Sequence, residues 1–149
     1  ALVHLSKKYR NVAVCTGYEL SLSKRLKQAS DLWLNNPRVP REASGTSGMT
    51  AAMNGSVNFS THDGWICEFI SHGNNGFVVP PIDYENISVH EQDEYDLNKI
   101  YEILENQVLP LYYENRDVWR QIIKNGMRDV RWQFDSNRMA KEYYDIMYQ

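Results

Sequence analysis

The stretch Glu42-Ala43-Ser44-Gly45-Thr46-Ser47-Gly48-Met49-Thr50 decides how this chain of 149 residues is expected to fold. It follows a short apolar run, Trp33 to Pro37, which has the composition of a buried strand that ends at a proline. It leads into a series of good helix formers that Gly55 stops. The glycine-rich segment is therefore predicted to lie at a strand-to-helix junction.

This junction has the composition of an anion-binding site. The backbone N–H groups and the positive dipole end of a helix start favour a phosphate, and Ser44, Thr46 and Ser47 add hydroxyl donors. Glu42 is unfavourable beside an anion but suits hydrogen bonds from sugar hydroxyls. An ordinary N-cap with tightly packed glycines explains the same residues, because short glycine motifs are weak signals. The pattern alone leaves both interpretations open.

The first part of the chain alternates strand-like and helix-like segments. Helices are predicted at residues 21–30 and 48–54, and strands at residues 11–15, 31–35, 56–60 and 77–79, with a further apolar segment at residues 65–70. Strands that alternate with helices are typical of a parallel sheet. The predicted fold class is therefore α/β, with a parallel sheet.

The rest of the chain is predicted to be helical. An apolar stripe runs from Leu97 to Leu109 and is expected to kink or end at Pro110, and further helices are predicted at 118–134 and 136–148. No glycine- or serine-rich linker and no internal repeat divides the sequence. We therefore expect a single domain over 1–149, with an α/β part at 1–90 and a helical part at 91–149.

Charge and composition exclude several classes of function. The net charge of -3, with no basic run and no apolar stretch of membrane-spanning length, argues against nucleic acid and membrane as partners. Cys15 and Cys67 stand far apart in apolar surroundings and are predicted to be buried, reduced thiols, so a cytoplasmic protein is expected. The four histidines share no ligand spacing, so no metal is predicted.

Two smaller features each allow two interpretations. His62-Asp63-Gly64 is either an acid–base pair or a turn around a hydrogen-bonded aspartate. Trp65 follows this turn and either contacts a ligand or anchors the core. Several other aromatic residues fall on apolar helical faces, where packing is the expected role, namely Tyr101, Trp119, Tyr143 and Tyr144.

Motifs along nearly the whole chain resemble those of the α-glucan phosphorylases, particularly the short bacterial and archaeal type. The matching segments are Leu32 to Pro37, Arg41 to Met49, Asn54-Gly55, Asp63-Gly64-Trp65, Leu104 to Tyr113, and Phe134 to Met139. They correspond to the tail portion of that family's polypeptide, so Ala1 is expected to lie within a longer chain. The resemblance implies a GT-B glycosyltransferase with two Rossmann-like lobes, of which this chain supplies the later part of the second.

The resemblance also implies roles for individual residues. Glu42, Ser44 and Gly45 would contact the donor glucose, Thr46, Ser47 and Gly48 would hold the phosphate of pyridoxal phosphate, and Asp63, Gly64 and Trp65 would lie near the crevice. The lysine that forms the family's Schiff base corresponds to Thr50. A threonine has no amine, so the covalent attachment of the cofactor cannot form at this position.

Three functions remain open at this stage. The first is phosphorolysis of α-1,4-glucan by phosphate to glucose 1-phosphate, and the second is transfer from a nucleotide sugar, as in glycogen and starch synthases. The third is glucan binding without turnover. In the family the substrate-phosphate ligands and a facing histidine come from earlier in the polypeptide, so the 149 residues alone are expected to be inactive. An open sheet edge and apolar patches predict self-association.

Overall fold

A computed structural model describes residues 2–148 and contains one parallel, three-stranded sheet in the order β1-β2-β3. The strands are β1 (Leu32–Asn35), β2 (Val57–Ser60) and β3 (Gly76–Val78). The register places Trp33 opposite Asn58 and Phe59 opposite Phe77. The α/β class with a parallel sheet is therefore confirmed.

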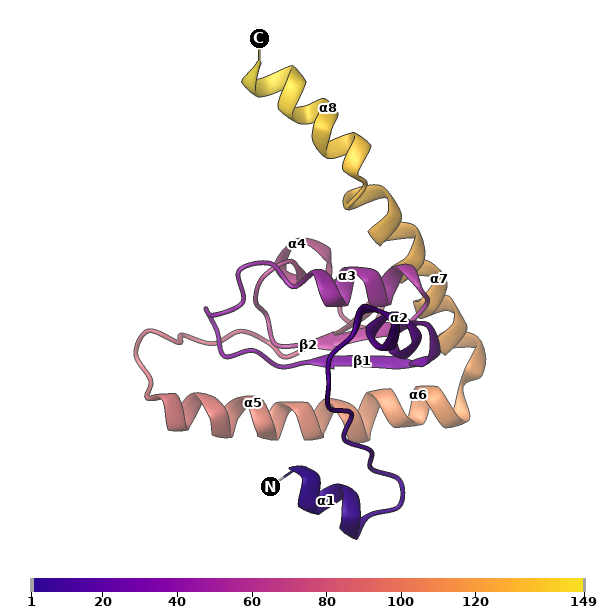
Figure 1. Ribbon diagram of the computed structural model, residues 1–149. Coiled ribbons are helices and arrows are strands. Elements are labelled where there is room, and N and C mark those ends of the chain that lie inside the picture. Colours follow the sequence, from indigo (N-terminus) through magenta and orange to yellow (C-terminus); the bar gives the residue numbers. More distant parts are fainter. Residues whose placement is uncertain (1, 149) are drawn as a thin grey trace.

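Helices cover both faces of this sheet (Figure 1). Those of the first part are α1 (Leu2–Lys8), α2 (Leu20–Ala29), α3 (Thr46–Met53) and α4 (Ile66–Phe69). The later helices are α5 (Val89–Ile103), the π-helical turn η1 (Leu104–Val108), α6 (Leu109–Glu114), α7 (Arg116–Gln133) and α8 (Ser136–Met147). In Figure 1, α3 and α4 lie above the sheet, α5 and α6 lie below it, and α7 closes one end.

The core consists of two apolar clusters, one on each side of the sheet. The first joins the sheet to α5, η1 and α7, and consists of Val57, Phe59, Phe77, Val79, Ile100, Ile103, Val108, Trp119 and Ile122. The second joins α3 and α4 to α7, and consists of Ala52, Trp65, Ile66, Phe69, Val78 and Val130. All four residues of β2 are buried, as expected for the central strand of a parallel sheet covered on both faces.

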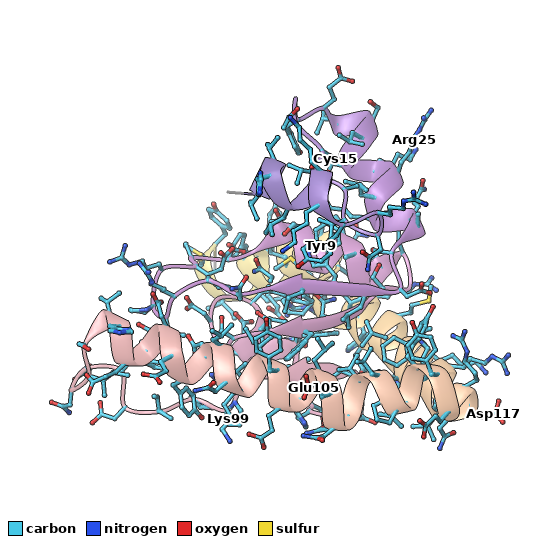
Figure 2. The ribbon with its side chains drawn as sticks, turned by 90° about the horizontal axis from the view of Figure 1, so that it is seen from below. Tyr9, Cys15, Arg25, Lys99, Glu105 and Asp117 are labelled. Atoms are coloured by element: carbon cyan, nitrogen blue, oxygen red, sulfur yellow. The ribbon has the colours of Figure 1, made fainter. Side chains whose placement is uncertain are left out.

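Pro110 neither ends nor sharply kinks the long helical run. The chain stays helical from Val89 to Glu114, because the turn before the proline opens into the π-helix η1, where the N–H of Leu109 donates to the carbonyl of Leu104. The wider turn accommodates the proline ring, which would clash with the carbonyl of Asn106 in a regular α-helix. Figure 2 shows this run from below, with Lys99 and Glu105 along it.

Three expectations need correction. Residues 11–15 form no strand; the segment has no partner strand within residues 2–148, so Cys15 is exposed. Cys67 is free as well but also exposed, because it lies on the outer side of α4. Trp119 is buried as predicted, whereas Tyr101, Tyr143 and Tyr144 are exposed.

The terminal helices project from the rest of the molecule (Figure 1). Neither α1 nor α8 contains a buried residue, and apolar side chains such as Leu20, Trp132 and Ile146 are largely exposed. Within residues 2–148, no helix combines the length and apolarity needed to cross a bilayer.

Candidate functional site

Two loops meet at the carboxyl end of the sheet, where open parallel sheets bind their ligands. The first, residues 36–45, joins β1 to α3, and the second, residues 61–65, joins β2 to α4. The backbone N–H of Glu42 donates to Asp63 Oδ2 over 2.8 Å, and the N–H of Trp65 donates to the carbonyl of Ser44 over 2.8 Å. The second loop thus holds the first in place.

The first turn of α3 is open. Gly45 occupies the N-cap position with φ 97°, a left-handed conformation that favours glycine. In the described part of the chain no side chain caps this turn, so neither Ser44 nor Glu42 closes it in the manner of an ordinary N-cap. The free N–H groups at Thr46 and Ser47 are therefore the donors that an anion could use.

Close packing behind the loop explains its glycines. A Cβ at Gly48 would lie 2.8 Å from Trp65 Nε1 and 2.8 Å from Asn58 Oδ1, and one at Gly45 would lie 3.0 Å from Trp65 Cδ1. A Cβ at Gly64, where φ is 57°, would lie 2.5 Å from the carbonyl oxygen of Ser44. The backbones of both loops approach their neighbours too closely for any side chain.

Trp65 supports this loop from inside the protein. It is 3% exposed, stacks on Phe69 at 4.5 Å between ring centroids, and meets Phe134 edge-on at 5.2 Å. Of the two interpretations of Trp65, the core anchor is therefore the one that the geometry matches, and the buried indole offers no free face for stacking on a sugar.

Asp63 forms the hydrogen-bonded turn rather than an acid–base pair with His62. Its buried carboxylate accepts the N–H groups of Glu42 and Gly64, over 2.8 and 2.9 Å. His62 Nδ1 instead lies 3.5 Å from Cys67 Sγ. Partial desolvation of this exposed residue, followed by the charge of Asp63, raises the pKa of the Cys67 thiol and so favours its protonated form.

Asn58 is a further residue of this region, and it was not among those predicted from the sequence. This buried residue on β2 donates from Nδ2 to the carbonyl of Gly48 over 3.1 Å, and so ties α3 to the sheet directly behind the open turn. Its one signal in the sequence is a strongly polar amide at the centre of an otherwise strand-like run. Such a residue is buried only when it has a specific partner.

Thr50 lies one turn further along α3 and is exposed. Its hydroxyl donates back into the helix, to the carbonyls of Thr46 at 3.1 Å and Ser47 at 3.0 Å. It also lines a cavity of about 310 Å³ between α2 and α3, together with Tyr18, Leu20, Ser23, Lys24, Lys27, Gln28 and Asn54. Within residues 2–148, no three His, Cys, Asp or Glu side chains come together in an arrangement that could hold a metal ion.

A parallel sheet covered on both faces, with an open helix start at its carboxyl end, is the arrangement of a Rossmann-like α/β lobe. Solved structures agree with this class. The structure of Alr3699/HepE from Anabaena in complex with UDP and glucose has a TM-score of 0.68 and 18% sequence identity, and the match covers 99% of this chain and 34% of that one. Its complex with UDP-glucose gives a TM-score of 0.65.

The sequence comparisons identify the family. Residues 5–111 match the carbohydrate phosphorylases, and the chain belongs to that family. It is 39% identical to the maltodextrin phosphorylase of Thermococcus litoralis, over 92% of this chain and 16% of the relative. It is 37% identical to the glycogen phosphorylase of Aquifex aeolicus, over 92% and 20%. An uncharacterized protein of Methanocaldococcus jannaschii is 40% identical, over 99% and 27%. The chain thus spans between about a sixth and a quarter of the length of these relatives.

Proposed function

We propose that this chain forms the glucose- and phosphate-binding wall of an α-glucan phosphorylase-type glycosyltransferase. The reaction would exchange a terminal glucose between an α-1,4-glucan and inorganic phosphate, with glucose 1-phosphate as the product. The observation that carries the proposal is the uncapped first turn of α3 at the carboxyl end of the sheet. Its N–H groups are fixed before any ligand arrives, so little reorganisation accompanies binding.

The residues divide into two groups along the loop. Thr46, Ser47 and Gly48 would hold the phosphate of pyridoxal phosphate, which supplies, when bound, a phosphate group as a proton donor. The second group, consisting of Glu42, Ser44 and Gly45, would contact the donor glucose. Asp63 fixes the backbone of Glu42 through a 2.8 Å hydrogen bond and so positions its carboxylate for sugar hydroxyls.

The fit to pyridoxal phosphate is partial. The open helix start suits its phosphate, but position 50 provides no amine, and the Thr50 hydroxyl is already bonded to its own helix. We therefore propose that any cofactor is held here without a covalent link. Borohydride treatment of the intact protein with pyridoxal phosphate is expected to leave Thr50 unmodified by mass spectrometry, and an adduct on Thr50 would contradict the assignment.

The proposed phosphate site at Thr46, Ser47 and Gly48 is tested by placing a negative charge beside it. In the intact protein, Ser47→Asp should weaken phosphate binding about tenfold or more, because a carboxylate about 5 Å from the anion repels it, whereas the similarly shaped Ser47→Asn should have little effect. Binding would be measured by calorimetry and turnover by release of glucose 1-phosphate from maltodextrin. Equal phosphate affinity of the two variants would show that this turn faces no anion.

A second candidate is transfer from a nucleotide sugar. Thr50 favours this candidate, because an enzyme that uses a nucleotide sugar needs no lysine at this position. The fold shared with a protein whose structure contains UDP-glucose favours it as well. Thr50→Lys distinguishes the two. A phosphorylase pocket should gain a borohydride-reducible adduct with pyridoxal phosphate, whereas a nucleotide-sugar enzyme should lose release of UDP from UDP-glucose. A protein that binds glucan but shows neither activity would support the non-catalytic alternative.

We also propose that the 149 residues alone associate with themselves, because the sheet edge at β1 and the apolar side of α8 have no cover within the described chain. Sedimentation at high concentration should show species heavier than a monomer. A monomer that binds no hydrophobic dye would refute this expectation.

A further inference from the structure

A cavity of about 460 Å³ lies between α4 and α7, and none of its lining residues belongs to the candidate site. Its first wall consists of Glu68 and Phe69 of α4, with Ser71 and Asn75 of the loop that follows. Its second wall is the last part of α7 and consists of Arg128, Asp129, Trp132 and Gln133. The volume falls within the range of small-molecule sites, about 300–1,000 Å³.

Two buried asparagines hold the walls of this cavity together. Asn75, which is 4% exposed, donates from Nδ2 to the carbonyl of Phe69 over 2.9 Å and to Asp129 Oδ2 over 3.2 Å. From α7, Asn125 Nδ2 donates to the carbonyl of Asn74 over 3.0 Å. The cavity is therefore formed before any ligand binds, and binding needs little ordering of its walls.

Trp132 offers its indole to a ligand beside this cavity. It is 78% exposed, whereas Trp65 and Trp119 are 3% and 2% exposed. Trp132 lies four residues after Arg128 and three after Asp129, so the three side chains share one face of α7. It also lines a cavity of about 1090 Å³ along α7 and α8, which leaves room for a ligand longer than one ring.

The polar side chains around Trp132 suit a neutral ligand rich in hydroxyl groups. Two carboxylates, those of Glu68 and Asp129, line the cavity with one guanidinium, that of Arg128, which disfavours an anion. Glu68 is exposed and takes part in none of the ion pairs of residues 2–148. Arg128 donates from Nε to Asp129 Oδ1 over 2.8 Å, which leaves its two terminal nitrogens for a ligand. The half-buried amide of Gln133 adds a donor and an acceptor.

A sugar ring has the surface that complements these groups. One face of a pyranose carries C–H groups, which stack on an indole, whereas the hydroxyls at its edge donate to carboxylates and accept from a guanidinium. We propose that the cavity between α4 and α7 binds a glucose unit of an α-glucan, with Trp132 as the stacking platform. The inference rests on the proposed function only for the kind of sugar, because recognition of a sugar follows from the lining residues themselves.

The test measures binding of α-cyclodextrin to the intact protein by calorimetry. This ring of α-1,4-linked glucose has no chain end, so it offers no terminal glucose for exchange with phosphate. Trp132→Ala is expected to weaken binding about tenfold or more, because truncation of an aromatic anchor removes the stacking surface. Trp132→Phe keeps a ring and should retain most of the affinity. Glu68→Gln should weaken binding about fivefold, because a charged acceptor is replaced by a neutral amide.

The matched control is Tyr101→Ala. Tyr101 is an exposed aromatic residue of α5, which lies on the opposite side of the sheet from α4 (Figure 1), so its loss should leave the affinity unchanged. Ser47→Asp alters the proposed phosphate site and should also leave α-cyclodextrin binding unchanged. Binding that is lost in Trp132→Ala and kept in both of these variants would support the inference, whether or not the protein releases glucose 1-phosphate from maltodextrin.

Three results would overturn the inference. The first is no binding of α-cyclodextrin by the wild-type protein, or equal binding by the wild type and Trp132→Ala. The second is loss of binding in Ser47→Asp, which would place the sugar in the candidate site. The third is equal quenching of tryptophan fluorescence by acrylamide in the wild type and Trp132→Phe, because Trp132 would then be covered by another part of the intact protein or by a partner. Release of glucose 1-phosphate together with any of these results would leave the proposed function standing.

Discussion

Gly48→Ala is expected to destabilise the protein even though Gly48 lies in a helix. Alanine in place of a helical glycine normally stabilises by about 1 kcal/mol. Here the new Cβ would lie 2.8 Å from Trp65 Nε1 and 2.8 Å from Asn58 Oδ1. Both neighbours are buried, and the overpacking of a core costs about 1–3 kcal/mol. Displacement of Asn58 would also lose its 3.1 Å bond to the Gly48 carbonyl, worth about 1 kcal/mol.

The sum is a loss of about 1–3 kcal/mol in the free energy of unfolding, obtained as the overpacking and hydrogen-bond costs minus the gain in helix propensity. Urea unfolding followed by tryptophan fluorescence should show a midpoint lowered by about 1 M for a loss of about 2 kcal/mol. Thr50→Ala is the matched control, because it changes an exposed residue of the same helix and should stay within about 0.5 kcal/mol of the wild type.

A double-mutant cycle tests the cause of the loss. Trp65→Phe removes the indole edge that carries Nε1 and Cζ2, the atoms of Trp65 that the new Cβ would approach at 2.8 and 3.0 Å. The two changes together should therefore cost less than the sum of the single changes, by about 0.5 kcal/mol or more. Additive losses, or a Gly48→Ala protein as stable as the wild type, would show that the loop is not packed against Trp65.

Three further predictions concern buried polar groups. Burial, followed by the charge of Asp93, raises the pKa of the Asp96 carboxyl above its ordinary 3.8. The protonated Asp96 carboxyl therefore stabilises the fold below its ordinary pKa, and this stabilisation is lost as the pH rises through the raised pKa. Asp96→Asn should consequently stabilise the protein by about 1 kcal/mol at pH 7 and by less near pH 4, as measured by urea unfolding. Burial of its hydroxyl and then the charge of Asp96 raise the pKa of the half-buried Tyr84 to about 12, so an ultraviolet titration should show a late-ionising phenol that Tyr84→Phe removes; an unchanged curve would count against the burial of that hydroxyl. Asn75 accepts the N–H of Ser71 over 2.7 Å and donates to the carbonyl of Phe69 over 2.9 Å, so Asn75→Ala should cost about 2 kcal/mol, and a loss below about 0.5 kcal/mol would contradict those bonds.

The parallel sheet was predictable from the sequence because each strand carries a local signal. The strand-like runs of β1 and β2 end at turn-forming residues, and the glycine-rich loop marks the junction into α3. The exposure of Cys15 was not predictable, because an apolar segment becomes a strand only when a partner strand lies beside it. The π-helical turn before Pro110 was also hidden, since a proline in a helical pattern usually indicates a break.

The position of the glycine-rich loop at the carboxyl end of the sheet was predictable, but the contacts that support the loop were not. Glycines and hydroxyl residues from 44 to 48 indicate a strand-to-helix junction in the sequence, and an anion site is one of the two interpretations of that pattern. The contacts of Asn58 and Trp65 behind this loop join residues far apart in sequence, and no local pattern reports them. The cavity between α2 and α3 was not predictable either, because only the packing of the two helices brings Lys24 and Lys27 to Thr50.

The contacts between residues 36–45 and 61–65 also limit how this protein can be recombined. A chimera with a crossover between Gly48 and Thr61 would take residues 36–45 from one parent and residues 61–65 from the other. Any residue other than glycine at position 64 would then place its Cβ 2.5 Å from the Ser44 carbonyl oxygen. The hydrogen bonds of Asp63 to Glu42 and of Trp65 to Ser44 would depend on parents with matching backbones. An engineer who wishes to transfer the proposed anion-binding loop to another parallel sheet should therefore move residues 36–65 as one block.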